Sequence, residues 1–186
     1  MISRIKAGPR DLSLYKKVRP EIRTGDCVLW KGKSLLARAV SLWSEYTHAS
    51  MIVRFDKYKE LLDRVFLVES LVTGAEMRLL SWRLEDAKGQ AWIYQPAGLS
   101  GEMRNQVREQ ALMMTARAVR YDYAGLFKNI LGRVSEDANR VFCSELVGIL
   151  WEECGLKRKK GAPKGIAPRP VDLTTWWQGK KIQVLL

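Results

Sequence analysis

The sequence predicts an α+β domain in which a small antiparallel sheet or barrel packs against helices. Residues 47–55 alternate apolar and polar side chains, which is the pattern of a strand with one buried face. Residues 64–71 form a nearly continuous apolar run, which suits a strand buried on both faces. Residues 141–154 instead place their apolar side chains at helical spacing.

The remaining elements follow from turn signals and from changes in periodicity. A strand is expected after the turn at Gly25-Asp26 because four apolar residues follow it. The chain between and after these segments predicts strands at 27–30, 76–82 and 90–95, helices at 33–43, 100–120 and 121–131, a polar loop at 135–140, a basic loop rich in Gly and Pro at 157–170, and a tail at 171–186 that packs back on the domain.

The chain has 186 residues, which suits one domain with a real core. Residues 1–23 are basic and weakly patterned, so we interpret them as an N-terminal arm with room for one short helix. Residues 24–186 then form the domain itself. No internal repeat and no linker divides them.

The formal net charge of +12 favours polyanionic partners such as nucleic acid, anionic lipid or the acidic polymers of a bacterial envelope. No nucleic-acid recognition motif accompanies this charge. No run of 18 apolar residues and no apolar signal-peptide region is present, so we expect cytoplasmic synthesis and no transmembrane segment. The three cysteines are too few and too irregularly spaced for a disulfide framework or a zinc site. We therefore expect reduced thiols, no metal and no cofactor.

Two residues are candidates for nucleophilic chemistry. Cys143 lies at the predicted opening of the helix 141–154, where free backbone N–H groups and the helix dipole favour a thiolate and can stabilise an oxyanion. Cys27 in a strand and Cys154 at a helix end fit buried, inert thiols better. His48, the single His of the chain, begins the strand 47–55 and is the candidate base, although a lone His is more often structural.

Glu69 interrupts the apolar run 64–71 and is the candidate orienting group. A buried carboxylate is costly unless it is paired, and a protonated imidazole on a neighbouring strand would pair it. The alternative places Glu69 at a strand end that faces water. With His48 and Cys143 it completes a set of nucleophile, base and orienter in the order His, Glu, Cys. We expect Glu69 rather than Asp122 in this role, because Asp122 falls between predicted helices.

Six short motifs carry a family resemblance over residues 22–175. The order of these motifs resembles that of the circularly permuted NlpC/P60 superfamily, specifically its YiiX-like branch, and more distantly that of the lecithin:retinol acyltransferase-like proteins. The motifs are Thr24-Gly25-Asp26-Cys27-Val28-Leu29, Tyr46-Thr47-His48-Ala49-Ser50, Val68-Glu69-Ser70, Tyr121-Asp122-Tyr123, Phe142-Cys143-Ser144-Glu145-Leu146-Val147 and Pro170-Val171-Asp172-Leu173.

The resemblance implies a papain-like core in which residues 24–186 form the catalytic domain and Cys143, His48 and Glu69 form the catalytic set. Relatives include cell-wall amidases, peptidases and some acyltransferases, so an amide, peptide or ester bond is the expected target. A Tyr near the nucleophile is common in the family, which makes Tyr121 and Tyr123 candidate substrate contacts, together with Ser144. The basic stretch 157–169 is expected at the rim of the cleft, where it would aid capture of an acidic substrate.

Three functions remain open from the sequence. The first is a cysteine hydrolase that cleaves peptidoglycan stem peptides or a related amide, made without a signal peptide and delivered to the envelope, as a phage protein would be. The second is an acyltransferase that passes the same thioester to an amine or a hydroxyl. The third is a non-catalytic binding or virion module that holds a polyanion through its basic segments. The joint presence of His48, Glu69 and Cys143 favours the two enzymes.

Overall fold

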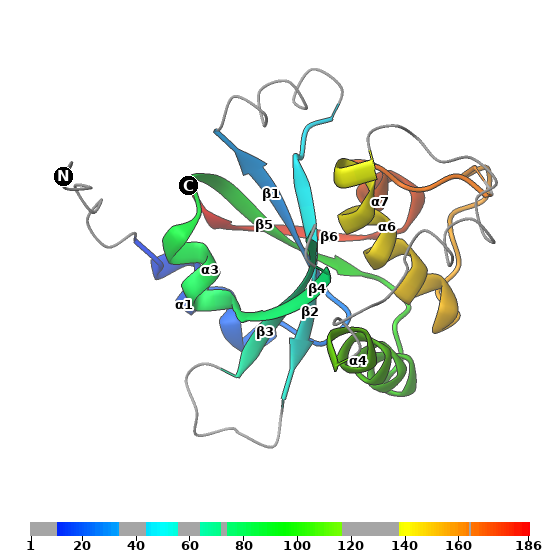
Figure 1. The fold of residues 1–186 in the computed structure, drawn as a ribbon, viewed down its shortest axis with the longest axis horizontal. Coiled ribbons are helices and arrows are strands. Elements are labelled where there is room, and N and C mark those ends of the chain that lie inside the picture. Colours follow the sequence, from blue (N-terminus) through cyan, green and yellow to red (C-terminus); the bar gives the residue numbers. More distant parts are fainter. Residues whose placement is uncertain (1–10, 34–43, 56–63, 72–73, 117–137, 164) are drawn as a thin grey trace.

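The computed structural model describes residues 11–33, 44–55, 64–71, 74–116, 138–163 and 165–186. Its centre is a six-stranded sheet in the order β4-β3-β2-β1-β5-β6, and each neighbouring pair runs antiparallel (Figure 1). Among the described strands the sheet is open, with β4 and β6 at its edges, so the predicted antiparallel sheet is confirmed in this form. The strands are β1 Cys27–Gly32, β2 His48–Arg54, β3 Val65–Leu71, β4 Gly74–Leu79, β5 Gly89–Pro96 and β6 Gly179–Leu185.

Helices cover both faces of the sheet (Figure 1). One face carries α4 (Gly101–Ala116), α6 (Ala138–Glu153) and α7 (Asp172–Trp176). The other carries α1 (Ser13–Val18), the 3-10 helix η1 (Arg19–Glu21) and α3 (Leu80–Asp86). In the described part of the chain, no helix has the length and apolar character needed to cross a membrane.

The two faces of the sheet build two hydrophobic cores, because strand side chains alternate between them. Leu29, Met51 and Val68 point to the first core, where they meet the apolar face of α6. Trp151 of α6 also donates its Nε1–H to the carbonyl of Gly25 at 2.8 Å. This packing fixes α6 against β2 and β3, which places Cys143. The second core joins side chains that alternate with these on the same strands to α1, α3 and β6.

The part of the predicted N-terminal arm that the structure describes belongs to this second core. Leu12, Tyr15 and Ile22 are buried there. Arg54, at the end of β2, donates from Nη1 to the carbonyl of Arg19 at 2.8 Å and to that of Ile22 at 2.7 Å. Residues 11–23 therefore pack against the sheet instead of extending from it.

The segment predicted as a strand at 76–82 is a strand in its first part and a helix in its second. The strand β4 spans Gly74–Leu79, and α3 begins at Leu80. Leu80 and Leu84 are buried, whereas Trp82 is 63% exposed. In a strand Leu80, Trp82 and Leu84 would all share one face, whereas in a helix Trp82 points away from the other two, so this burial pattern is helical and the strand prediction was wrong beyond Leu79.

The helix that carries Cys143 begins earlier than predicted. α6 spans Ala138–Glu153, so residues 138–140 are helical and not part of the predicted polar loop 135–140. The strands at 27–30, 47–55, 64–71 and 90–95 and the irregular stretch at 157–170 are confirmed, and the tail pairs with β5 as β6. The helix at 100–120 is confirmed as far as Ala116. The predicted helices at 33–43 and 121–131 lie almost wholly or wholly outside the described residues.

Candidate active site

The pairing of β2 with β3 brings His48 and Glu69 together. The register joins Met51 to Val68 and Ile52 to Leu67, which carries Glu69 toward the start of β2. His48 Nε2 lies 2.8 Å from Glu69 Oε1. The Glu69 side chain is 1% exposed and that of His48 is 21% exposed. The carboxylate is therefore buried and paired with the imidazole, and does not face water at a strand end.

Two further side chains contact the Glu69 carboxylate, and Trp30 holds both of them. Ser50 donates its hydroxyl to Glu69 Oε1 at 2.9 Å and accepts from Trp30 Nε1 at 2.8 Å. Arg83 of α3 donates from Nε to Glu69 Oε2 at 3.3 Å and stacks its guanidinium 4.6 Å from the centre of the Trp30 ring. Both carboxylate oxygens thus accept hydrogen bonds, which fixes the carboxylate opposite the imidazole.

Cys143 approaches the same imidazole from α6. Its thiol makes a hydrogen bond with His48, and the Cys143 side chain is buried at 5% exposure. Since Nε2 of His48 faces Glu69, Nδ1 is the ring nitrogen left for the thiol. The structure thus joins Cys143, His48 and Glu69 in one hydrogen-bonded chain, as a nucleophile, base and orienter would be.

The charged forms of His48 and Glu69 stabilise each other. Burial alone would lower the pKa of His48, but the hydrogen bonds with Cys143 and Glu69 outweigh it and raise the pKa to about 9. Burial alone would raise the pKa of Glu69, but the hydrogen bond and charge of His48, followed by Arg83 and Ser50, lower it to about 2. The imidazolium and the carboxylate are therefore the favoured forms at neutral pH.

The other two thiols are poor nucleophiles by comparison. Burial, followed by the nearby Asp26 carboxylate, raises the pKa of Cys27 well above its ordinary value. Burial also raises the pKa of Cys154, and hydrogen bonds with the backbone oppose this only in part. Its Sγ lies 3.1 Å from the carbonyl of Trp151. Neither thiol has an imidazole partner, because His48 is the single His of the chain and contacts Cys143.

The position of Cys143 within α6 corrects one part of the sequence argument. The helix begins at Ala138, so Cys143 lies in its second turn and its backbone N–H falls among those that bond within the helix. The helix dipole acts mainly within the first turn. The contact with His48, and not the helix end, is therefore what distinguishes Cys143 from the other two thiols.

The other predicted site residues are placed only in part. Tyr121, Tyr123 and Asp122 lie outside the described residues. Ser144 is buried and donates its hydroxyl to the carbonyl of Pro168 at 2.7 Å, so it holds the end of the loop that follows α6. Its contact with substrate stays a prediction.

Glu145 is a buried carboxyl in the same motif as Cys143. Burial raises its pKa to about 7. Residues two apart on a helix point about 200° away from each other, so Glu145 lies on the far side of α6 from Cys143. We assign it no part in the set of Cys143, His48 and Glu69.

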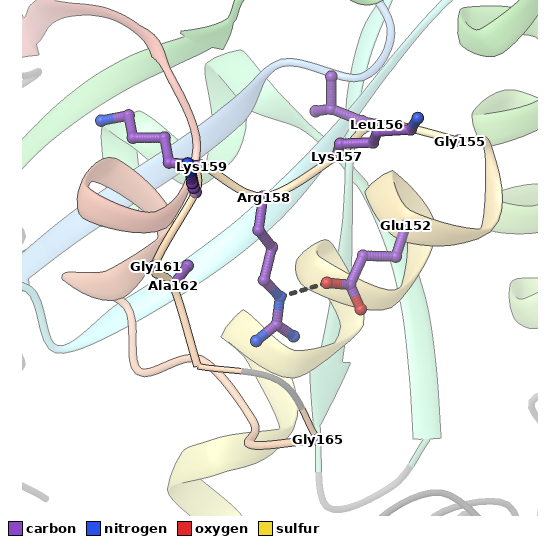
Figure 2. Close-up of a pocket in the computed structure, with 10 residues that line it drawn as sticks. Glu152, Gly155, Leu156, Lys157, Arg158, Lys159, Gly161, Ala162 and Gly165 are labelled. Carbon is purple, nitrogen blue, oxygen red and sulfur yellow. Dashed lines mark hydrogen bonds and ion pairs between the residues drawn. The ribbon is translucent and has the colours of Figure 1, made fainter.

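The basic loop after α6 is organised around Arg158 (Figure 2). This guanidinium pairs with Glu152, stacks 4.7 Å from the centre of the Trp176 ring and donates to the carbonyl of Ile166 at 3.2 Å. The loop borders a cavity of about 830 Å³, to which exposed lysines contribute. It leaves α6 at the end opposite Cys143 and returns beside Ser144 through Pro168. Its predicted role in substrate capture stays a prediction, but Arg158 supports the loop and is not one of its exposed charges.

Sequence comparison and structural comparison give different results for this chain. No protein-family model matches the sequence, and no curated protein matches it. One solved structure similar to it is the crystal structure of the metalloprotein YiiX from Escherichia coli O157:H7, with 17% identity and a TM-score of 0.50. The match covers 86% of this chain and 87% of that one.

The chain has a YiiX-like fold. At 17% identity the YiiX-like likeness concerns the fold alone. It agrees with the branch to which the sequence motifs pointed, and it extends over most of both chains.

Because that neighbour is described as a metalloprotein, the site can be tested for a metal. In the described part of the chain, no group of three or more His, Cys, Asp and Glu side chains is arranged to hold an ion. The contacts of Glu69 also argue against a metal ion, since its carboxylate already accepts from His48, Ser50 and Arg83. Arg83 supplies beside this carboxylate the positive charge that a cation would supply. The described residues do not fit a metal site, and the chemistry below uses none.

Proposed function

We propose that this chain is a cysteine hydrolase of the papain-like, permuted NlpC/P60 kind that cleaves an amide or peptide bond. The observation that carries the proposal is the hydrogen-bonded chain of Cys143, His48 and Glu69, assembled from α6, β2 and β3. The YiiX-like fold supports it because the six sequence motifs belong to a family with that arrangement of roles.

In the proposed reaction the reactive form has the thiol proton already on His48, and the Cys143 sulfur attacks the carbonyl carbon of the substrate. A bond forms between sulfur and carbon, and the carbonyl π electrons move onto oxygen. When they return, the carbon–nitrogen bond breaks, and the imidazolium of His48 gives its proton to the leaving nitrogen. The products of this half are an amine and a thioester on Cys143.

In the second half His48 takes a proton from water, and the oxygen of that water attacks the thioester carbon. The sulfur leaves with its bonding electrons and the acid product departs. Glu69 is a positioning residue throughout, because it holds the ring with Nδ1 toward the sulfur and stabilises the imidazolium. Ser50, Trp30 and Arg83 fix Glu69 in turn.

The substrate class follows from the family resemblance and the charge. Relatives with these motifs include cell-wall peptidases and amidases, and a net charge of +12 suits an acidic polymer. We therefore propose peptides of the bacterial cell wall as substrates.

The experiment that tests this function looks for the covalent intermediate. The full chain is mixed with p-nitrophenyl acetate, quenched in acid and digested, and the acetyl group is located by mass spectrometry. We expect the acetyl thioester on Cys143, its absence in Cys143→Ala, and its persistence in the control Cys154→Ala. Parallel digestion of purified peptidoglycan should release new amino termini only with Cys143 present. Acetylation at Cys27 or Cys154, or none at all, would contradict the proposed mechanism.

A further inference from the structure

A second concave site lies at the far end of β2 from His48. It is a cavity of about 400 Å³ between the segment 20–24, Arg54 and the first turns of α4. Because Arg54 ends the strand that His48 begins, the two sites lie ~20 Å apart at about 3.3 Å per residue. Four of the residues that line this cavity are arginines: Arg23, Arg54, Arg104 and Arg108.

Two of these arginines are held in place by the fold. Arg54 is 7% exposed, and its Nη1 donates to the carbonyls of Arg19 and Ile22. Arg104 donates from Nη1 to the carbonyl of Thr24 at 2.5 Å and to Asp26 Oδ1 at 3.1 Å. Because these contacts already hold both guanidinium groups in place, an anion that binds them costs little further side-chain entropy.

The other two arginines lie nearer to solvent. Arg23 is exposed on the segment 20–24, and Arg108 is half-buried on α4, where it donates to Asn105 Oδ1. Arg104 and Arg108 are four residues apart, so they share one face of α4, and like charges at this spacing repel. A bound anion would remove that repulsion.

The balance of charge around the cavity is strongly positive. Among the described residues that line it there is no Asp or Glu. Asp26 lies behind Arg104, and its Oδ2 already accepts from the backbone N–H of Arg23 and from Gln95 Nε2. Gly101 also lines the cavity, so the positive end of the α4 dipole faces it.

We propose that this arginine pocket binds a phosphate group. Planar guanidinium groups offer paired N–H donors that match the oxygens of phosphate, which a single ammonium does not. The volume holds one phosphate group with part of a larger molecule attached. Free phosphate compounds and the headgroup of an anionic phospholipid share this chemistry, and the experiment separates the two sources. The proposal is independent of the cysteine chemistry at the other end of β2.

The test compares two variants that lose the same charge from different places. Arg23→Gln with Arg108→Gln changes the outer side chains of the pocket and leaves Arg54 and Arg104 in place. Lys157→Gln with Lys159→Gln removes two exposed charges from the basic loop and is the matched control. Calorimetric titration with inorganic phosphate, at constant ionic strength set by chloride, gives the affinity. Sedimentation with phosphatidylcholine vesicles, with and without phosphatidylglycerol, gives the lipid arm, and thermal unfolding checks that both variants fold.

We expect saturable binding in at least one arm, weakened about tenfold or more in the arginine variant and about twofold or less in the lysine control. Binding of inorganic phosphate identifies a free phosphate compound as the source, and binding confined to phosphatidylglycerol vesicles identifies a lipid headgroup. Equal loss in both variants would show that net charge alone drives binding and would overturn the proposal. Absence of saturable binding in both arms would overturn it as well.

Discussion

Replacing Glu69 with glutamine should lower the pKa of His48 by about one unit or more. The pKa of about 9 compares with an ordinary value of 6.5, a difference worth ~3 kcal/mol that the Cys143 and Glu69 hydrogen bonds provide against burial. The Glu69→Gln variant loses the charge of one of these two partners and keeps the burial. If Glu69 supplies a third or more of the effect, the loss is ~1 kcal/mol or more, or about one pH unit.

The assay is direct because the chain contains one His. The imidazole C–H resonances in an NMR titration therefore belong to His48 and need no assignment by mutation. Glu76→Gln is the matched control, since Glu76 is the cross-strand partner of Glu69 but is partly exposed and pairs with Arg78. We expect the pKa of His48 to fall in Glu69→Gln and to stay close to the wild-type value in Glu76→Gln. An unchanged pKa in Glu69→Gln would refute the pairing of the two side chains as the source of the raised value.

Three further predictions concern Ser50, Glu69 and the basic loop after α6. Ser50→Ala should lower the free energy of unfolding by ~1–3 kcal/mol in a urea titration, because it leaves the buried Trp30 Nε1–H without its partner and removes one of the hydrogen bonds to Glu69 Oε1; an unchanged midpoint would contradict this. The pKa of Glu69 is lowered, so its stabilising effect is complete above about 4.5 and is lost as pH falls through about 2; unfolding midpoints should fall over this range in the wild type and less in Glu69→Gln. Serine substitution of the exposed loop lysines should raise KM for an acidic substrate and leave kcat nearly unchanged, whereas a matching fall in kcat would remove the loop from substrate capture; the lysines are Lys157, Lys159 and Lys160.

The elements that position the site were predictable because their signals are local. Alternation along β2 and the apolar run of β3 each lie within one strand, and a single carboxylate in that run already required a partner. The apolar spacing of α6 likewise identified the face that meets the sheet. His48, Glu69 and Cys143 could therefore be proposed as a set before their distances were known.

The residues that support the carboxylate could not be predicted in the same way. Trp30, Ser50 and Arg83 come from three elements, and only the register of β1 on β2 and the packing of α3 bring them to Glu69. The helical position of Arg83 was also missed, because a strand was expected at 76–82. No Gly or Pro marks the change from β4 to α3 in the sequence.

Two other differences have a similar cause. The N-terminal segment carries only a few apolar side chains among many charges, so its place in the second core depends on contacts distant in sequence. The start of α6 was placed too late because Glu136, Asp137, Asn139 and Arg140 suggest a loop, although a polar first turn is compatible with a helix. That error moved Cys143 to a helix end and overstated the influence of the dipole on its thiol.

The central claim is that His48 activates the Cys143 thiol, and alkylation kinetics test it most directly. The chain is treated with iodoacetamide at neutral pH without denaturant, and labelling of Cys27, Cys143 and Cys154 is followed by mass spectrometry, in the wild type and in His48→Ala. We expect Cys143 to react first in the wild type and at least about tenfold more slowly in His48→Ala, because the imidazolium that stabilises the thiolate is gone. Faster labelling of Cys27 or Cys154 in the wild type, or an unchanged Cys143 rate in a folded His48→Ala variant, would contradict the account.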